Sequence, residues 1–175
     1  MKIKAILAMS PSGAIGDGKL LYRNKQDLSH FKNRTMGDIL IMGRKTYQEA
    51  GALKGRIIIV VSSTLSSSGN PENVLIARSP LEALEKAEFM WQSVRESRKS
   101  KKSCVWVCGG KTIYDVLFHK CSEIVATRFY KEPKRKIDKG NLKKVSIPDN
   151  FERNCDVQLE DFAIVSYIKK RKAWL

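Results

Sequence analysis

Short apolar segments alternate with longer amphipathic segments along the chain. Short segments rich in Ile and Val are typical of buried strands, whereas apolar positions three and four residues apart indicate helices. Strands are predicted at residues 3–9, 38–42, 56–61, 73–77, 104–108, 123–129, 155–159 and 163–169. Helices are predicted at residues 25–35, 44–50, 80–96 and 111–118.

The order of these segments predicts the fold class. Strands that alternate with helices favour an α/β domain with a largely parallel sheet, because a helix must carry the chain back before the next parallel strand. Only three residues, 160–162, separate the last two strands, and this spacing is typical of a hairpin with an antiparallel edge. Because we find no internal repeat and no linker, we expect residues 1–175 to form a single domain.

The cysteine and histidine content bears on metals and location. The four cysteines are Cys104, Cys108, Cys121 and Cys155, and they form no C-x-x-C pair. With only two histidines besides, we expect no metal site and reduced thiols, as in a cytoplasmic protein. No apolar segment is long enough to cross a membrane, and we expect a monomer.

The chain is strongly basic, with 33 Lys and Arg against 18 Asp and Glu, a net charge of +15. Such a charge favours anionic partners such as nucleic acid, an anionic surface or phosphorylated ligands. Much of it lies in two predicted loops, at about residues 95–103 and 131–144, and in a tail at residues 169–175. Nucleic-acid contact is not favoured, because aromatic residues are not interleaved with the basic ones.

Asp27 is a single carboxylate inside the amphipathic segment 24–32. At helical spacing, Asp27, Leu28 and Phe31 fall on one side, and Thr35 follows one turn later. One interpretation is a solvated residue or a helix cap. The other is a carboxylate in an apolar pocket that binds a cationic or amidine-like ligand edge.

Two apolar segments end in glycine just before a predicted helix, at residues 39–46 and 105–112. Glycine lets a ligand approach the backbone closely, and the free N–H groups of a helix start favour an anion. Arg44 and Lys45 would add charge-assisted donors to the first junction. Neither segment contains G-x-G-x-x-G, so either could also be a plain strand–turn–helix connection.

Two further features suggest ligand contacts. Arg56 opens a predicted strand, where its guanidinium could hold a carboxylate through two hydrogen bonds. Ser62 and Ser63 follow the carboxyl end of that strand, where open α/β sheets bind ligands. A glycine-containing loop, residues 13–18, precedes the Asp27 helix and is either an ordinary turn or a loop that closes over a ligand.

Read in order, these segments resemble dihydrofolate reductase from residue 3 to about residue 169. The motifs that carry the resemblance are Ala14-Ile15-Gly16, Asp27-Leu28-x-x-Phe31-Lys32-x-x-Thr35, Ile41-Met42-Gly43-Arg44-x-Thr46, Gly55-Arg56, Val60-Val61-Ser62-Ser63, Val107-Cys108-Gly109-Gly110-x-x-Ile113-Tyr114 and Thr127. The resemblance implies an eight-stranded, mostly parallel sheet with an antiparallel C-terminal edge and four flanking helices. It also implies hydride transfer from NADPH to 7,8-dihydrofolate, giving 5,6,7,8-tetrahydrofolate.

The resemblance also assigns roles to individual residues. The implied catalytic residues are Asp27, which would bind the pterin edge, with Thr127 and Tyr22. The implied substrate-binding residues are Ile6, Leu7, Leu28, Phe31, Arg56 and Cys108. The implied cofactor-binding residues are Ala8, Ile15, Gly16, Gly43, Arg44, Lys45, Thr46, Ser62, Ser63, Arg78, Gly109, Gly110, Lys111, Thr112, Ile113 and Tyr114. Since the family joins its paired glycines by a cis peptide, we expect one between Gly109 and Gly110.

The chain departs from the family pattern at several positions. The usual Leu-Pro-Trp before the first helix is Leu20-Leu21-Tyr22, so the Tyr22 hydroxyl would have to order the water that the family's tryptophan holds. Lys111 stands where a third glycine is usual, and residues 51–56 lack the family's prolines. A basic loop at residues 131–144 replaces an acidic segment.

Two other functions remain open on the sequence. One is a related pterin or pyrimidine reductase on the same fold, against which Asp27 and Arg56 together argue, since a phosphoribosyl substrate has no glutamate carboxylate. The other is a non-catalytic module that binds nucleic acid or serves a structural role through its basic surface.

Overall fold

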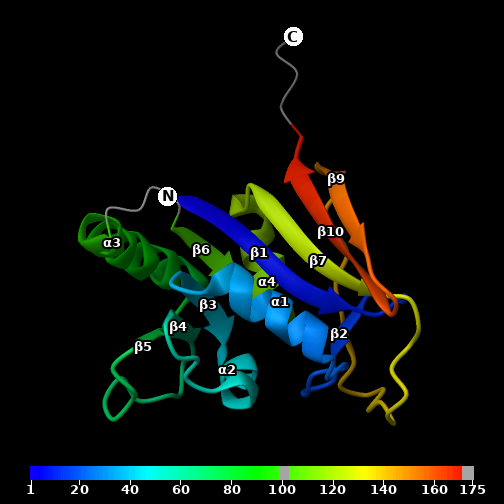
Figure 1. The fold of residues 1–175 in the computed structure, drawn as a ribbon. Coiled ribbons are helices and arrows are strands. Elements are labelled where there is room, and N and C mark those ends of the chain that lie inside the picture. Colours follow the sequence, from blue (N-terminus) through cyan, green and yellow to red (C-terminus); the bar gives the residue numbers. More distant parts are fainter. Residues whose placement is uncertain (99–102, 171–175) are drawn as a thin grey trace.

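The computed structural model describes residues 1–98 and 103–170 (Figure 1). Its strands are β1 (Lys2–Met9), β2 (Ala14–Gly16), β3 (Ile39–Gly43), β4 (Ile57–Val61), β5 (Val74–Ala77), β6 (Cys104–Val107), β7 (Glu123–Phe129), β8 (Lys143–Lys144), β9 (Phe151–Gln158) and β10 (Phe162–Lys169). Its helices are α1 (Lys25–Thr35), α2 (Arg44–Ala50), α3 (Pro80–Arg98) and α4 (Lys111–Leu117), followed by a 3₁₀ turn, η1 (Phe118–Lys120).

The main sheet has eight strands in the order β5-β4-β3-β6-β1-β7-β10-β9. The pairings from β5 to β7 are parallel, whereas β10 pairs antiparallel with both β7 and β9. The sequence prediction of a mostly parallel α/β sheet with an antiparallel C-terminal edge and four helices is therefore confirmed.

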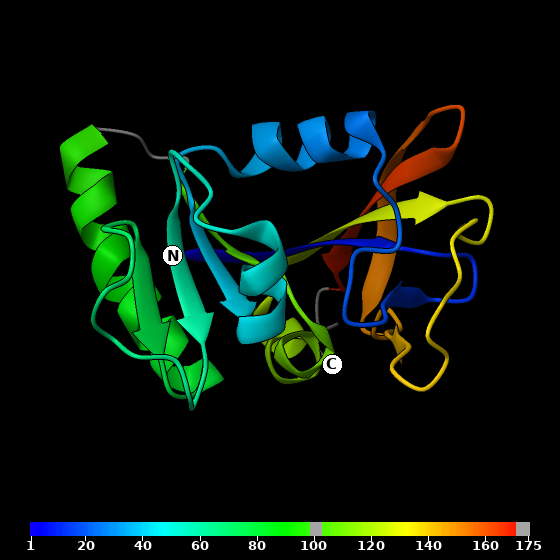
Figure 2. The same ribbon diagram turned by 90° about the horizontal axis from the view of Figure 1, so that it is seen from below.

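Helices cover both faces of the sheet, as Figure 2 shows with α1 and α4 on opposite sides. Side chains alternate between the faces along a strand. On β1, Leu7 belongs to the apolar cluster that includes α3 and α4, whereas Ile6 belongs to the cluster against which Phe31 of α1 packs. This alternation decides which residues can reach a ligand bound beside α1.

Element boundaries differ from the predictions in a few places. The helix predicted at residues 80–96 continues to Arg98, and β9 begins at Phe151, earlier than the predicted strand 155–159. The short strands β2 and β8 were not predicted, because they pair with each other across more than a hundred residues and carry little local pattern. The strand predicted at 104–108 ends at Val107, and that at 56–61 begins at Ile57.

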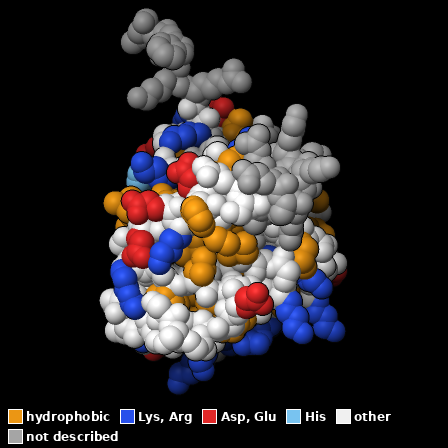
Figure 3. Space-filling view, turned by 90° about the vertical axis from the view of Figure 1, so that its left-hand side faces the viewer, with side chains coloured by type: hydrophobic (Ala, Val, Ile, Leu, Met, Phe, Trp, Pro, Cys, Tyr) orange, Lys and Arg blue, Asp and Glu red, His pale blue; other side chains and the backbone are white. Residues whose placement is uncertain are grey.

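The basic segments differ in what the structure describes. The predicted loop 95–103 lies outside the described residues from 99 to 102, and the basic tail does so from 171 to 175. Figure 3 views the molecule from the side of α3, where Lys and Arg side chains are scattered around a central apolar area rather than gathered in a stripe. Within residues 1–98 and 103–170, no helix has both the length and the apolar character needed to cross a bilayer.

Candidate active site

Asp27 lies in the first turn of α1 and is buried, with 7% of the residue exposed. Asn24 caps this helix, because its side-chain oxygen accepts the N–H groups of Gln26 at 2.9 Å and of Asp27 at 3.2 Å. The interpretation of Asp27 as the helix cap or a solvated residue is therefore excluded. Burial raises the pKa of Asp27, and a hydrogen bond from the Thr127 side chain partly opposes that rise.

Thr127 approaches Asp27 from the middle of β7 and is only 2% exposed. In the pairing of β1 with β7, Ala8 lies directly beside Thr127. Ile6, two residues earlier on β1, shares that face of the sheet. The structure thus brings two predicted catalytic residues together with two predicted ligand contacts under α1.

Arg56 is a second buried charge in the same region, and it is 8% exposed. Its Nη1 donates to Thr35 Oγ1 at 3.3 Å, and the guanidinium lies 6.0 Å from the ring centroid of Phe31. The buried Nε has no hydrogen-bond partner, and no carboxylate pairs with Arg56 within residues 1–98 and 103–170. Burial lowers the pKa of Arg56, yet guanidinium stays charged, so the side chain is set to receive an anion.

The other predicted substrate contacts do not all lie on the same side of the sheet as Asp27. Cys108 packs against the apolar cluster on the α1 side, where burial raises the pKa of its thiol. Leu28 is 45% exposed on α1. The side chain of Leu7 lies in the cluster on the opposite face, so the structure does not bring it to Asp27.

The two glycine junctions meet at the carboxyl ends of the neighbouring strands β3 and β6. The N–H of Gly43 donates to the carbonyl of Gly109 at 2.7 Å. The peptide between Gly109 and Gly110 is cis, as the resemblance implied. Gly109 has φ +90°, and a Cβ there would lie 2.6 Å from a ring carbon of Tyr114, so only glycine fits. The segments predicted separately to contact a cofactor therefore form one surface.

Basic and hydroxyl side chains border the surface formed by Gly43, Gly109 and Gly110, which we call the glycine surface. Arg44 and Lys45 are exposed at the start of α2, and within the described part of the chain no acid pairs with either. A Cβ on Gly110 would lie 3.6 Å from Thr46 Oγ1, which places this hydroxyl against the glycine pair. Lys111 instead pairs with Asp115 at 2.6 Å, so its charge is balanced within α4.

Three other predicted cofactor residues lie on α4 after Lys111. Thr112 is exposed, whereas Ile113 and Tyr114 are buried in the apolar cluster between α4 and the sheet. The Tyr114 hydroxyl donates to the carbonyl of Ile6 at 2.7 Å. Ile113 and Tyr114 therefore contribute chiefly by fixing α4 against β1.

Ser62 and Arg78 brace the turn after β4. The Ser62 hydroxyl accepts the N–H groups of Thr64 and Leu65, at 3.2 and 3.0 Å. Arg78 Nη1 donates to the carbonyls of Ser62 and Leu65, at 2.9 and 2.7 Å. Ser63 is exposed between them. Much of the hydrogen-bonding capacity of Arg78 is therefore used within the protein.

Tyr22 lies in the connection between β2 and α1. Its ring stacks on Phe129, with centroids 3.7 Å apart and an interplanar angle of 5°. Its hydroxyl donates to the carbonyl of Lys131 at 2.9 Å. Burial, together with the negative charge of Glu132, raises the pKa of Tyr22 to about 12. The hydroxyl therefore stays protonated across the physiological range.

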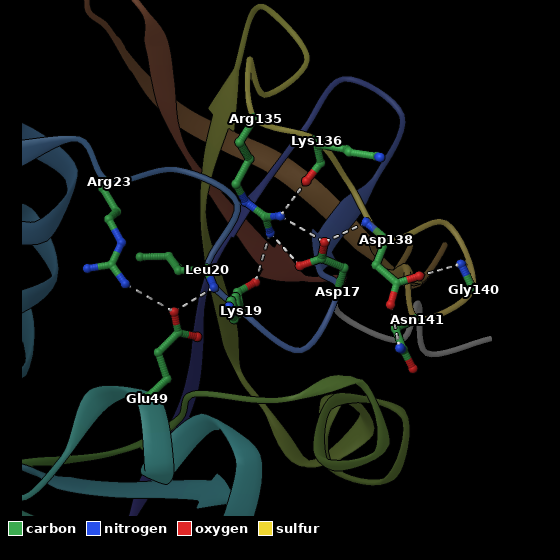
Figure 4. A network of polar contacts seen from close by, with 10 residues as sticks. All are labelled: Asp17, Lys19, Leu20, Arg23, Glu49, Arg135, Lys136, Asp138, Gly140 and Asn141. Carbon is green, nitrogen blue, oxygen red and sulfur yellow. Dashed lines mark hydrogen bonds and ion pairs between the residues drawn. The ribbon is translucent and has the colours of Figure 1, made fainter.

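The connection between β1 and α1 is tied to the basic 131–144 segment by an ion pair that the sequence analysis missed (Figure 4). Both terminal nitrogens of Arg135 donate to the carboxylate oxygens of Asp17, whose side chain is 5% exposed. The N–H of Asp138 donates to the same carboxylate at 2.9 Å. These bonds hold the pKa of Asp17 well below its usual range. The basic segment is thus a partner of this loop and is not simply solvated.

A second tie holds the same connection from the other side. The N–H of Leu20 donates to Glu49 Oε1 at 2.7 Å, and Glu49 belongs to α2. Arg23 lies 3.8 Å from the same oxygen. Ile15, on β2, packs against the apolar cluster on the α4 side, and Gly16 ends this strand. The only sequence signal for these ties was an acid between Gly16 and Gly18.

Comparison with known proteins agrees with this geometry. A family model described as dihydrofolate reductase matches residues 2–143. A dihydrofolate reductase of Mycoplasma genitalium is 28% identical over 170 residues, which are 96% of this chain and 98% of the relative. A dihydrofolate reductase type 1 of Escherichia coli is 32% identical over 164 residues, which are 93% of this chain and 92% of the relative. The chain belongs to the dihydrofolate reductase family.

Members of the dihydrofolate reductase family are oxidoreductases that use NADPH, and the residues present fit this cofactor. Arg44 and Lys45, at the start of α2, have no acidic partner within the described residues, so their cations are available for the phosphates of the cofactor. Within residues 1–98 and 103–170 no group of His, Cys, Asp and Glu is arranged to hold a metal ion.

Proposed function

We propose that this protein transfers hydride from NADPH to 7,8-dihydrofolate, giving 5,6,7,8-tetrahydrofolate. The observation that carries the proposal is the presence of two buried ionisable side chains, Asp27 and Arg56, on the same side of the sheet. Neither has a partner of opposite charge within the described residues. A buried charge without a partner is costly, so such a pair is retained where a ligand completes it. Dihydrofolate carries both complements, an amidine-like pterin edge and a glutamate carboxylate.

In this proposal Asp27 binds the pterin edge, and Thr127 steadies its carboxylate. Ile6 and Phe31 pack around the ring, and Arg56 holds the glutamate α-carboxylate through its unused N–H donors. When bound, NADPH supplies the hydride. Asp27 favours the protonated, more electrophilic substrate, because a raised carboxyl pKa makes it a better proton carrier near neutral pH.

Tyr22 has a narrower role in this proposal. Its hydroxyl proton is directed to the carbonyl of Lys131, so the oxygen can still accept a hydrogen bond from a water molecule. With a pKa raised to about 12, the phenol orders such a water but does not itself act as the base. A Tyr22→Phe variant therefore reduces turnover less than a change at Asp27.

Further aspects of the proposal concern the setting of the enzyme. The cysteines Cys104, Cys108, Cys121 and Cys155 are free thiols, as in proteins of a reducing compartment, and we place the activity in the cytoplasm. We also propose that the chain acts as one domain and as a monomer, with the basic surface drawing the two anionic reactants toward the cleft.

The decisive experiment measures NADPH oxidation by the purified protein, with and without dihydrofolate, by absorbance. Dihydrofolate-dependent oxidation that methotrexate abolishes is the expected result. If the protein binds NADPH but turns over only a phosphoribosyl-pyrimidine substrate, the proposed substrate is wrong. If it binds neither NADPH nor dihydrofolate, the whole proposal fails and a non-catalytic role of the basic surface takes its place.

A further inference from the structure

A second hollow lies on the opposite face of the sheet from Asp27. It is an open hollow of about 370 Å³, and Met9, Arg128, Val145, Ser146, Ile147 and Tyr167 are among its lining residues. Met9 and Val145 belong to the apolar cluster on the α4 side of the sheet. None of the residues around Asp27 and Arg56 lines this hollow.

Arg128 reaches this hollow because side chains alternate along β7. Thr127 turns toward Asp27, so the next residue, Arg128, turns to the other face. Arg128 is half-buried, and its Nη1 donates to the Tyr167 hydroxyl at 2.9 Å. Within residues 1–98 and 103–170, no carboxylate pairs with Arg128 and no other acceptor bonds to its guanidinium. Most of its five N–H donors are therefore available to a ligand.

Charged residues of both signs lie near the hollow. Glu132 is an acid at its edge, and its carboxylate accepts the N–H of Ser12 at 2.9 Å. Burial acts to raise the pKa of Glu132, but the hydrogen bonds from Ser12 and Ser10 and the positive charge of Lys144 outweigh it and lower the pKa. Glu132 bonds to these partners and forms no ion pair with Arg128 within the described residues, so the donors of Arg128 stay available.

Part of the remaining lining is apolar, beside the polar residues Ser12 and Ser146. Met9 and Val145 are buried, at 3% and 8% exposed, and Ile147 packs against the same cluster. The Tyr167 ring completes the lining beside the guanidinium. A ligand that fits must present a small apolar body to these side chains and one negative group to Arg128.

We propose that this hollow is a second ligand site, which binds a small organic monoanion with its carboxylate on Arg128 and its apolar body against Met9, Val145 and Ile147. The planar guanidinium suits a carboxylate through two parallel hydrogen bonds. The Tyr167 hydroxyl, which accepts from Arg128, holds the guanidinium in place and keeps its own proton for the ligand. The site stands independently of the proposed reductase activity.

Benzoate titrated into the full-length protein tests the proposal, with backbone amide chemical shifts as the readout. We expect saturable shifts at Met9, Gly13 and Ile147, about tenfold weaker affinity in Arg128→Gln, and unchanged affinity in the matched control Arg56→Gln. Arg128→Lys, which keeps the charge without the planar fork, should lie between Arg128→Gln and the unaltered protein. Because the shifts are mapped first on the unaltered protein, the location of the benzoate site does not depend on the folding of any variant.

Two comparison probes separate the parts of the site. Benzyl alcohol has a similar apolar body without the charge, and binding equal to that of benzoate would show that Arg128 recognises no anion, which overturns the proposal. Inorganic phosphate has charge without the apolar body, and equal binding would remove the apolar walls from recognition and also overturn it. Benzoate shifts that vanish in Arg56→Gln, or that never saturate, would assign the binding to the Asp27 cleft or to no site.

Discussion

The molecule contains two sets of one aspartate and one arginine, and they differ in pairing. Asp17 and Arg135 form an ion pair, whereas Asp27 and Arg56 do not. Asp17 and Arg135 bond each other through both oxygens and both terminal nitrogens, and the pKa of Asp17 lies well below its usual range. Asp27 and Arg56 are more deeply buried, but neither has a partner of opposite charge within the described residues, and the pKa of Asp27 is raised. The paired set joins two loops, and the unpaired set is the one that we propose a ligand completes.

This contrast shows how to separate structural from functional charges in the molecule. Removing one partner of an ion pair destabilises the fold, whereas an unpaired buried charge is costly in itself and marks a candidate ligand site. The same contrast holds between Arg78, which braces the turn after β4, and Arg44, which has no acidic partner within the described residues. Each prediction below changes one member of these pairs.

The largest effect is expected for Asp27→Asn. The amide keeps the shape of the side chain but cannot carry a proton to the substrate, so turnover at neutral pH should fall by about 10²- to 10⁴-fold. NADPH affinity should not change, since the glycine surface is untouched. Steady-state rates and a fluorescence titration with NADPH measure both, and near-normal turnover would remove Asp27 from the mechanism.

Arg56→Gln should act mainly on substrate binding. Loss of a charge-assisted contact costs about 1.5–3 kcal/mol, so KM for dihydrofolate should rise about 10- to 100-fold with a smaller change in kcat. Dihydropteroate, which lacks the glutamate, is the matched control substrate, and its KM should not change. An equal rise in KM for both substrates would instead indicate a general disturbance of the cleft.

Arg44→Gln and Arg78→Gln should separate a free from an engaged arginine. We expect Arg44→Gln to weaken NADPH binding about tenfold and to leave NADH binding unchanged, because only NADPH carries the 2′-phosphate. Arg78→Gln should lower the Tm, since the Arg78 guanidinium bonds the carbonyls of Ser62 and Leu65, and it should weaken NADPH binding less than Arg44→Gln does. A larger loss of NADPH affinity in Arg78→Gln than in Arg44→Gln would assign the 2′-phosphate to Arg78.

The smallest effects are on stability, and their signs are opposite. The low pKa of Asp17 adds stability that is present above the unfolded value of about 3.9 and is lost as the pH falls through the folded pKa. Asp17→Asn should therefore lower the Tm at pH 7 by roughly 3–10 °C, and by less at low pH.

The raised pKa of Asp27 has the reverse effect, because it costs nothing below about pH 3.9, a growing amount from there up to the folded pKa, and a constant amount above that. Asp27→Asn should therefore raise the Tm at pH 7 and have little effect at pH 3. Thermal unfolding of both variants across this pH range is the measurement. A lower Tm for Asp27→Asn at pH 7 would contradict the assignment of Asp27 as an unpaired buried charge.

Some of the molecule is determined locally and could be predicted. The apolar segments gave the order of strands and helices, because strand and helix periodicities are properties of neighbouring residues. Asp27 was singled out because it interrupts an amphipathic helix, and Gly109 and Gly110 because a ligand-binding junction needs residues without side chains. These features depend on residues that are close together in the sequence.

Other features depend on how distant segments pack. Asp17 and Arg135 are 118 residues apart, and nothing in either segment names the other. The face on which Leu7 lies, the bonds that engage Arg78, and the hollow beside Arg128 likewise follow from strand register and from the paths of loops. Local sequence patterns thus predicted most of the helices and strands and singled out candidate site residues such as Asp27. The tertiary structure decided which charges are paired and which remain free, because pairing depends on distances that only the folded chain sets.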